Sequence, residues 1–166
     1  MKTLIIYYSR SGVTKTVAEK IAPLLNADTE ELIDTKDRSG VIGYAVACKD
    51  ALGKKAFPTE PLKSKLSEYD LIIIGTPVWA STMSTATRFF LQSFGKDIAQ
   101  AAVFCTTGRT GIDKTNSQSA DLIAGNVIAS AGFVQKFVKK NNIDDDVVFF
   151  VDQIKENYRP LPENLR

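Results

Sequence analysis

The stretch Leu4-Ile5-Ile6-Tyr7-Tyr8-Ser9-Arg10-Ser11-Gly12-Val13-Thr14 decides the fold of this 166-residue chain. Its first half is an apolar run that predicts a buried strand, and its second half is a hydroxyl-rich turn that leads into a helix. The first N–H groups of a helix have no acceptor inside it and form the positive end of its dipole. Together with the hydroxyls of Ser9, Ser11 and Thr14 they describe a cradle for an oxyanion, and Gly12 lets the backbone turn closely around it.

The composition of this turn narrows the oxyanion to one kind of phosphate. The turn holds a single glycine, whereas a dinucleotide fingerprint needs three, and no lysine ends it as in a P-loop. An ordinary capped helix start is the alternative, because Ser and Thr are common first residues of helices. Three hydroxyls exceed what capping needs, so the pattern favours a phosphate site for one terminal phosphomonoester.

Apolar runs alternate with helical patterns along the chain, which predicts an open parallel sheet with helices on both faces. The patterns predict strands over 3–8, 30–33, 71–75, 101–105 and 133–138, and helices over 13–22, 40–52, 85–94, 117–130 and 144–158, with a short helical turn at 63–67 and an irregular tail at 160–166. The first helix is expected to kink or end near Ala22 because Pro23 follows. Five such strands fit the doubly wound order 2-1-3-4-5, a three-layer α/β/α fold forming one domain over 1–166.

Three helices have apolar stripes that predict their buried faces. The stripe Val147, Val151, Ile154 and Tyr158 is the clearest helical period in the chain. In the helix over 40–52 we expect Val41, Tyr44, Cys48 and Leu52 to face the core, and in the helix over 117–130 we expect Ala120, Ile123 and Val127 to do so.

The doubly wound order directs attention to the loops after the first, third and fourth strands, because ligands bind where the order reverses. The loop after the third strand contains Thr76-Pro77-Val78-Trp79-Ala80, and its Trp is the only one in the chain. An indole there offers a platform for a flat aromatic ring, although a Trp packed beneath the loop is the alternative. The loop after the fourth strand, Thr106-Thr107-Gly108-Arg109, can wrap the edge of a heteroaromatic ring, with Arg109 beside the ring or in solvent.

On these residues the chain resembles the flavodoxins, whose phosphate loop reads [ST]-x-[ST]-G-x-[ST] and holds the phosphate of FMN. The resemblance implies that FMN is bound by Ser9, Arg10, Ser11, Gly12, Val13 and Thr14 at its phosphate, and by Thr76, Pro77, Val78, Trp79, Ala80, Thr106, Thr107, Gly108 and Arg109 around its ring. The chain departs from flavodoxins in its slightly basic charge, in its long segment over 38–61, and in lacking the second stacking aromatic of the loop after the fourth strand. We therefore expect one face of the ring to be more open.

Composition excludes several classes of function. The chain has no His, so a Ser-His-Asp triad, a Cys-His dyad and a Cys/His zinc site are impossible, and Cys48 and Cys105 are expected to be small core residues. A net charge of +2 without a basic stripe argues against nucleic-acid binding. No apolar run is long enough for a membrane span and nothing resembles a cleavable signal, so we expect a cytoplasmic protein.

Two functions remain open, and redox chemistry in either would come from the cofactor. In the first, an FMN-containing electron-transfer protein passes electrons to a redox partner protein. In the second, an enzyme takes hydride from NAD(P)H and reduces a quinone or similar small electron acceptor. The open ring face, the basic charge and the resemblance of Gly75-Thr76-Pro77 to the loop of flavin-dependent quinone reductases favour the second function. The small size and the single domain favour the first, which we take as the prediction, with the reductase as the alternative.

Overall fold

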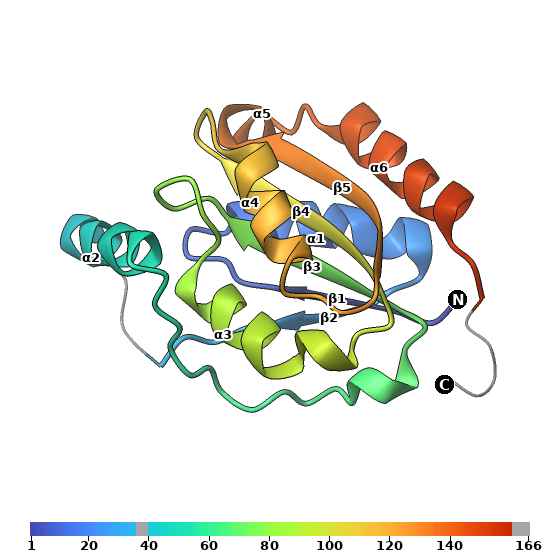
Figure 1. Ribbon diagram of the computed structural model, residues 1–166. Coiled ribbons are helices and arrows are strands. Elements are labelled where there is room, and N and C mark those ends of the chain that lie inside the picture. Colours follow the sequence, from blue (N-terminus) through green and yellow to red (C-terminus); the bar gives the residue numbers. More distant parts are fainter. Residues whose placement is uncertain (36–39, 161–166) are drawn as a thin grey trace.

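The structure is a computed structural model, and it describes residues 1–35 and 40–160. Its elements run in the order β1 (Thr3–Tyr7), α1 (Val13–Leu25), β2 (Asp28–Glu31), α2 (Gly40–Leu52), the short 3₁₀ helix η1 (Leu66–Glu68), β3 (Leu71–Pro77), α3 (Thr85–Phe94), the 3₁₀ helix η2 (Gly95–Asp97), β4 (Gln100–Thr107), α4 (Ile112–Ala120), β5 (Asn126–Val134), α5 (Gln135–Lys139) and α6 (Asp144–Asn157) (Figure 1).

The five strands form one parallel sheet in the order β2-β1-β3-β4-β5, which confirms the predicted doubly wound topology. Ile5 of β1 pairs with Thr29 of β2 on one side and with Ile73 of β3 on the other. Because the strands are parallel, the loops that follow β1, β3 and β4 leave the sheet at the same edge. This edge is the switch point to which the sequence directs attention.

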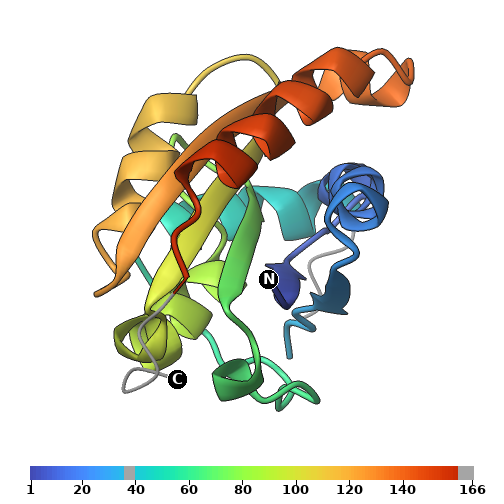
Figure 2. The ribbon, with the colours of Figure 1, turned by 90° about the vertical axis from the view of Figure 1, so that its right-hand side faces the viewer.

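Helices cover both faces of the sheet, α1 and α6 on one and α3 and α4 on the other (Figures 1 and 2). Successive residues of a strand point to opposite faces, so a central strand must be apolar throughout. Ile73 accordingly joins the core under α1 and α6, while its neighbours Ile72 and Ile74 join the core under α3. The continuous apolar runs of β1 and β3 therefore reflect burial on both faces.

Several predicted elements agree closely with the structure. The bounds of α2 and α3 match the prediction, and α6 begins at Asp144, as the acidic cluster at 144–146 indicates. The strands β3 and β4 are longer than predicted by one or two residues at their ends, and the short helical turn lies at Leu66–Glu68. Residues 161–166 of the predicted tail lie outside the described residues.

The predictions over 117–138 are wrong. The helix predicted over 117–130 does not exist as one element: α4 ends at Ala120, and the edge strand β5 follows it. The strand predicted over 133–138 is made up of the end of β5 and the helix α5. The stripe that includes Ile123 and Val127 fits a helix locally, yet the β5 backbone pairs with β4 along its length. Whether a segment forms a strand depends more on the strands that it pairs with than on its own sequence. Pairing with β4 therefore outweighs the helical pattern of these residues.

The first helix and the second strand also differ from prediction. Helix α1 continues through Pro23 to Leu25, because Pro23 lies in the last turn and interrupts the helical hydrogen bonds only there. Strand β2 runs over Asp28–Glu31 rather than 30–33, since its pairing with β1 starts opposite Leu4. Leu32 nevertheless donates its N–H to Tyr7 O at 2.7 Å and buries its side chain.

The predicted buried face of α2 is wrong. Its buried residues are Ala47, Asp50 and Ala51, whereas Val41 is 86% exposed and Leu52 is 69% exposed. Helix α2 is apolar on nearly all sides, so its sequence does not distinguish one face from another. No helix among the described residues is long and apolar enough to cross a membrane.

Candidate functional site

A hollow of about 330 Å³ lies at the edge of the sheet where β1, β3 and β4 end. Its volume falls in the range of small-molecule sites, about 300–1,000 Å³. It is lined by Arg10, Ser11, Val13, Thr14, Tyr44, Pro77, Val78, Trp79, Thr106, Gly108, Gln135 and Lys139. The structure thus brings the three predicted loops together around one hollow.

The turn after β1 supplies backbone donors to this hollow. Gly12 has φ 82°, a left-handed conformation that suits glycine, and α1 starts at the next residue. The N–H groups of Val13 and Thr14 have no acceptor within the helix. The first turn of α1 contains no acidic residue that would compete with an anion for the helix dipole. The donor set fits a phosphate group.

A buried pair of hydroxyls connects this turn to the loop after β4. Thr14 Oγ1 and Thr106 Oγ1 are 2.8 Å apart, and both side chains are almost completely buried. Each hydroxyl carries one proton, and the hydrogen bond between the two residues uses only one of these two protons. The second proton can be donated to another acceptor. Both residues line the hollow, and a bound anion there would accept that proton.

Ser9 does not line the hollow, unlike the other two hydroxyl residues of the turn, Ser11 and Thr14. Its Oγ accepts a hydrogen bond from the backbone N–H of Lys15 at 3.2 Å. In this structure Ser9 therefore caps the start of α1, which is the structural role that Ser residues often take there.

The loop after β3 makes a tight turn that positions Trp79. Trp79 and Thr82 exchange both backbone hydrogen bonds, at 2.8 and 3.0 Å, and the residues between them, Ala80 and Ser81, have φ 49° and 59°. Two successive positive φ angles are unusual for residues with a Cβ. At the start of the loop, the buried Thr76 Oγ1 accepts a hydrogen bond from the N–H of Ser84 at 3.0 Å.

The loop after β4 has its own hydrogen bonds. Thr107 Oγ1 donates to Thr110 O at 2.6 Å and accepts from the N–H of Arg109 at 3.2 Å. A Cβ added at Gly111 would approach Val78 Cγ1 to 2.9 Å, so the loops after β3 and β4 are closely packed. Gly108 has open space around it and lines the hollow.

The structure therefore divides the predicted site residues into two groups. Nine of them line the hollow, namely Arg10, Ser11, Val13, Thr14, Pro77, Val78, Trp79, Thr106 and Gly108; the other six, Ser9, Gly12, Thr76, Ala80, Thr107 and Arg109, belong to the same loops without lining it. Ser9, Thr76 and Thr107 make hydrogen bonds that hold the backbone of these loops.

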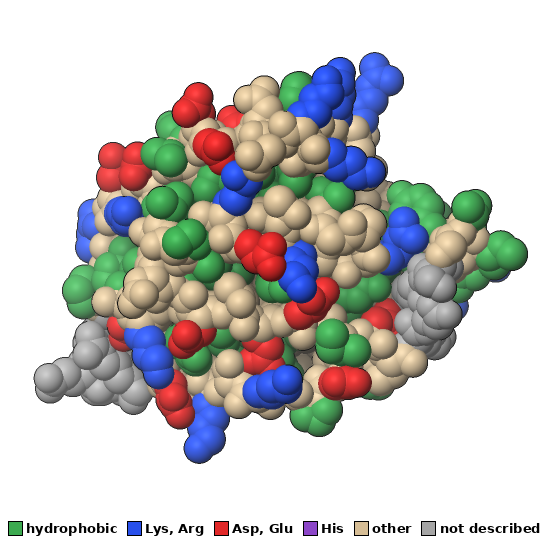
Figure 3. Space-filling view, turned by 180° about the vertical axis from the view of Figure 1, so that it is seen from behind, with side chains coloured by type: hydrophobic (Ala, Val, Ile, Leu, Met, Phe, Trp, Pro, Cys, Tyr) green, Lys and Arg blue, Asp and Glu red, His purple; other side chains and the backbone are tan. Residues whose placement is uncertain are grey.

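Three lining residues escaped the sequence analysis: Tyr44 of α2, and Gln135 and Lys139 of α5. Tyr44 was predicted to face the core, and the α5 residues were assigned in part to a strand. Helix α5 lies at the top of the molecule in Figure 1. Figure 3, which shows the molecule from behind, has several Lys and Arg side chains close together at the top. A run of three lysines at 136, 139 and 140 was the available signal for this basic end of the site.

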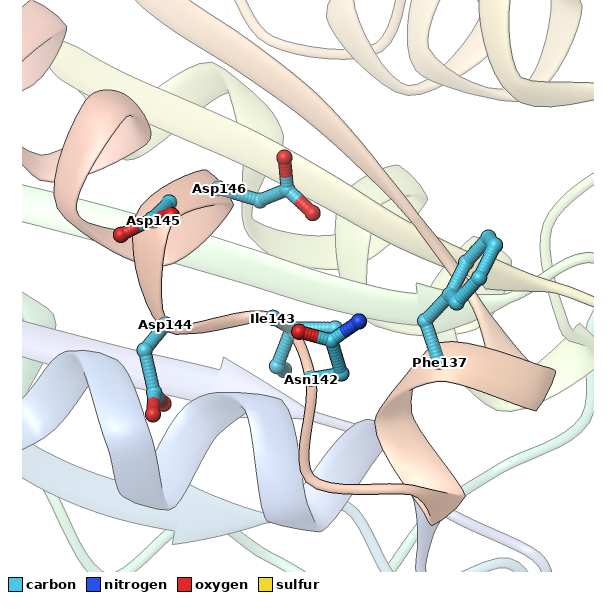
Figure 4. A pocket seen from close by; sticks show the side chains of 6 residues that line it. All are labelled: Phe137, Asn142, Ile143, Asp144, Asp145 and Asp146. Atoms are coloured by element: carbon cyan, nitrogen blue, oxygen red, sulfur yellow. The ribbon is translucent and has the colours of Figure 1, made fainter.

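A larger hollow, about 460 Å³, lies between α5 and the start of α6. Its carboxylates, Asp144, Asp145 and Asp146, point in different directions (Figure 4). Asp144 Oδ1 pairs with Lys20 Nζ of α1 at 2.6 Å. Across the described ranges 1–35 and 40–160, no group of three His, Cys, Asp or Glu residues could hold a metal ion. The acidic cluster serves the N-terminus of α6.

Comparison with known proteins agrees with this architecture. A flavoprotein from Lactobacillus acidophilus NCFM, solved in complex with FMN, is similar with 28% identity over 84% of this chain and 97% of that chain, at a TM-score of 0.68. An oxidised flavodoxin 1 from Bacillus cereus is similar in fold, with 19% identity over 96% of this chain and all of that one, at a TM-score of 0.54. So is a WrbA-like flavodoxin from Agrobacterium tumefaciens, with 17% identity over 95% of this chain and 99% of that chain, at a TM-score of 0.56.

A family model described as flavodoxin matches residues 2–152, which is most of the chain. The match spans β1 through most of α6 and so includes all three loops around the hollow. The chain belongs to the flavodoxin family.

Proposed function

We propose that this protein binds one FMN in the hollow at the carboxyl ends of β1, β3 and β4, and that it transfers electrons through this flavin. The observation that carries the proposal is the phosphate cradle: the N–H groups of Val13 and Thr14, the side chain of Ser11 and the buried pair of Thr14 and Thr106 converge on one place. Such a helix start binds a phosphate through its N–H groups and its dipole.

The same hollow also has room and a suitable surface for the flavin ring. Beyond the cradle its walls are Pro77, Val78 and Trp79 from one loop and Gly108 from the other, an apolar surface suited to a flat heteroaromatic ring. When bound, FMN would supply the electron-accepting chemistry, while the chain binds and orients it. A cradle built for a single phosphate favours FMN over FAD, and the FMN complex of the L. acidophilus relative supports the same choice.

Titration of flavin-free protein with FMN, FAD and riboflavin tests this proposal. We expect one FMN per chain, with quenching of the emission of Trp79, the only Trp present. In Ser11→Glu a carboxylate would face the phosphate dianion and should abolish FMN binding. The matched control is Ser117→Glu on the exposed side of α4, which should bind FMN normally. Preference for FAD, or FMN affinity unchanged in Ser11→Glu, would overturn the assignment.

A second candidate function is that of an NAD(P)H-dependent reductase acting on a quinone or similar small acceptor. Two cationic residues, Arg10 and Lys139, line the hollow, and the chain carries a net charge of +2. Positive charge near the site attracts an anionic dinucleotide donor. Anaerobic mixing of the FMN-loaded protein with NADH or NADPH distinguishes the two functions: bleaching of the flavin spectrum supports the reductase, and an unchanged spectrum supports the carrier.

A further inference from the structure

Helix α2 extends beyond the carboxyl ends of the strands, next to the loop after β3 (Figure 1). Its buried side rests on the protein through Ala47 and Ala51, and hydrophobic side chains gather where it lies, at the right of Figure 3. One residue of α2, Tyr44, lines the cofactor hollow and is 41% exposed. A large aromatic side chain that is both in the hollow and partly exposed has surface available for a ligand.

Trp79 has much less surface to offer. It is 2% exposed, and its ring meets the ring of Tyr8 edge to face, with centroids 5.4 Å apart and an interplanar angle of 85°. It belongs to the core cluster that includes Ala47 of α2 and Met83. The tight turn between Trp79 and Thr82 holds it there. Trp79 therefore borders the hollow from within the core, and stacking a ring along its face would require the loop to rearrange.

Tyr44 is held in place by the phosphate turn itself. The guanidinium of Arg10 lies 4.8 Å from the centroid of the Tyr44 ring, and Arg10 Nη1 donates to Gly40 O at the start of α2 at 3.5 Å. Arg10 thereby connects the turn that would hold the phosphate to the aromatic ring beside it. A hydrogen bond with Cys48 and partial burial raise the pKa of the Tyr44 phenol.

The other end of α2 is closed by a local contact. The buried Asp50 accepts a hydrogen bond from Lys55 Nζ at 3.0 Å, and the N–H of Lys55 donates to Asp50 O at 3.0 Å. The helix is held against the protein by the buried Ala47 and Ala51 and by the contact of Arg10 at its start. This arrangement keeps Tyr44 at the hollow.

We propose that Tyr44 is the aromatic side chain on which the isoalloxazine ring of the cofactor packs, so that α2 provides the ring contact that the loop after β4 lacks. Arg10 lies over the Tyr44 ring, and the ring keeps 41% of its surface exposed and lines the hollow, so it has surface left for the flavin. This inference rests on the proposed FMN site and adds to it a residue from outside the three loops. It also gives the long segment before β3 a role in the site.

The test compares FMN binding by the wild type, Tyr44→Ala, Tyr44→Phe and Trp79→Phe, with Val46→Ala as the matched control. Val46 lies on the same helix, is 47% exposed and does not line the hollow. We expect Tyr44→Ala to weaken FMN affinity roughly tenfold, the size of a lost aromatic stack. Tyr44→Phe should keep most of the affinity, Trp79→Phe should weaken binding less than Tyr44→Ala does, and Val46→Ala should be indistinguishable from wild type.

The emission of bound FMN is a second readout, because an aromatic side chain packed on a flavin quenches its fluorescence. We expect this emission to rise in Tyr44→Ala alone. Unchanged affinity and emission in Tyr44→Ala, with both altered in Trp79→Phe, would overturn the assignment of Tyr44 and leave the FMN site standing. A wild type that binds no FMN would overturn the proposed function and the inference together. Thermal unfolding of each variant checks that it is folded.

Discussion

At the scale of single residues, the buried hydroxyl pair of Thr14 and Thr106 is the most specific feature of the site. The two residues are 92 positions apart in the sequence, and their Oγ1 atoms are 2.8 Å apart in the structure. A buried hydroxyl that loses its partner costs about 1–3 kcal/mol. The pair therefore fixes the phosphate turn against the loop after β4 as well as offering a proton to an anion.

Thr14→Val should lower both stability and FMN affinity. Valine has nearly the same shape but leaves Thr106 Oγ1 without its partner, so we expect a loss of about 1–3 kcal/mol in the free energy of unfolding. FMN affinity should fall by about tenfold, measured by flavin titration. Thr16→Val serves as the control, since Thr16 Oγ1 donates only to Gly12 O within the helix. Equal effects of the two substitutions on FMN affinity would show that Thr14 has no particular role.

Lys139 is the residue with which to test the electrostatic part of the site. It lines the hollow from α5 and is exposed, so its interaction with a phosphate is screened by solvent and salt. We expect Lys139→Gln to weaken FMN binding by at most about 1 kcal/mol, with the difference disappearing at high salt. Lys136→Gln, one turn away and outside the hollow, should have no effect. A deficit that persists in high salt would mean that Lys139 makes a direct, desolvated contact.

At the scale of elements, the turn over Trp79–Thr82 combines a role at the site with backbone strain. Its central residues, Ala80 and Ser81, both have positive φ, where a Cβ costs about 1–2 kcal/mol. Turns of this kind usually contain Asn or Gly. Strained residues at a ligand site persist when the surrounding structure enforces them.

Ala80→Gly should therefore stabilise the protein. Removing the Cβ relieves the left-handed conformation, and the greater freedom of glycine in the unfolded chain offsets part of the gain, which leaves about 0.5–1 kcal/mol. Such a gain raises the melting temperature by about 1–4 °C in a domain of this size. The same change in a helix, Ala45→Gly in α2, should destabilise by about 0.5–1 kcal/mol. Calorimetry should show a higher melting temperature in Ala80→Gly and a lower one in Ala45→Gly. A loss of stability in Ala80→Gly would show that the turn is unstrained.

At the scale of the whole molecule, the buried side chains of Tyr7 and Cys105 make the free energy of unfolding depend on pH in the alkaline range. Burial raises the pKa of Tyr7 from 10.0 to about 12, with Glu31 and Glu19 adding to the effect. Burial also raises the pKa of the Cys105 thiol from 9.0 to about 12, with Asp113 adding to it. In both cases the unfolded chain loses its proton first, so the stabilisation is full below the unfolded pKa and is lost as pH rises toward the folded one.

We predict that the free energy of unfolding falls between pH 9 and pH 12, first through Cys105 and then through Tyr7. Urea denaturation at several pH values checks this. Cys105→Ala should flatten the decline that begins near pH 9, and Tyr7→Phe the part that begins near pH 10. A double variant as sensitive to alkali as the wild type would show that other groups are responsible.

The sequence by itself determined the three central strands of the sheet and the place of the site. The strands β1, β3 and β4 are buried on both faces, so their residues are continuously apolar and the runs are visible without a structure. The phosphate turn is equally local, because the start of a helix and its hydroxyls lie within six residues of one another. Nine of the predicted residues consequently line the hollow.

Only the tertiary structure decided the parts that depend on distant neighbours. The edge strand β5 carries a helical pattern, and it is a strand because β4 pairs with it. Helix α2 is apolar on nearly all sides, so only its packing shows that Ala47 and Ala51 face inward and that Tyr44 reaches the hollow. Burial of Trp79 and exposure of Tyr44 likewise follow from packing, which no local pattern records.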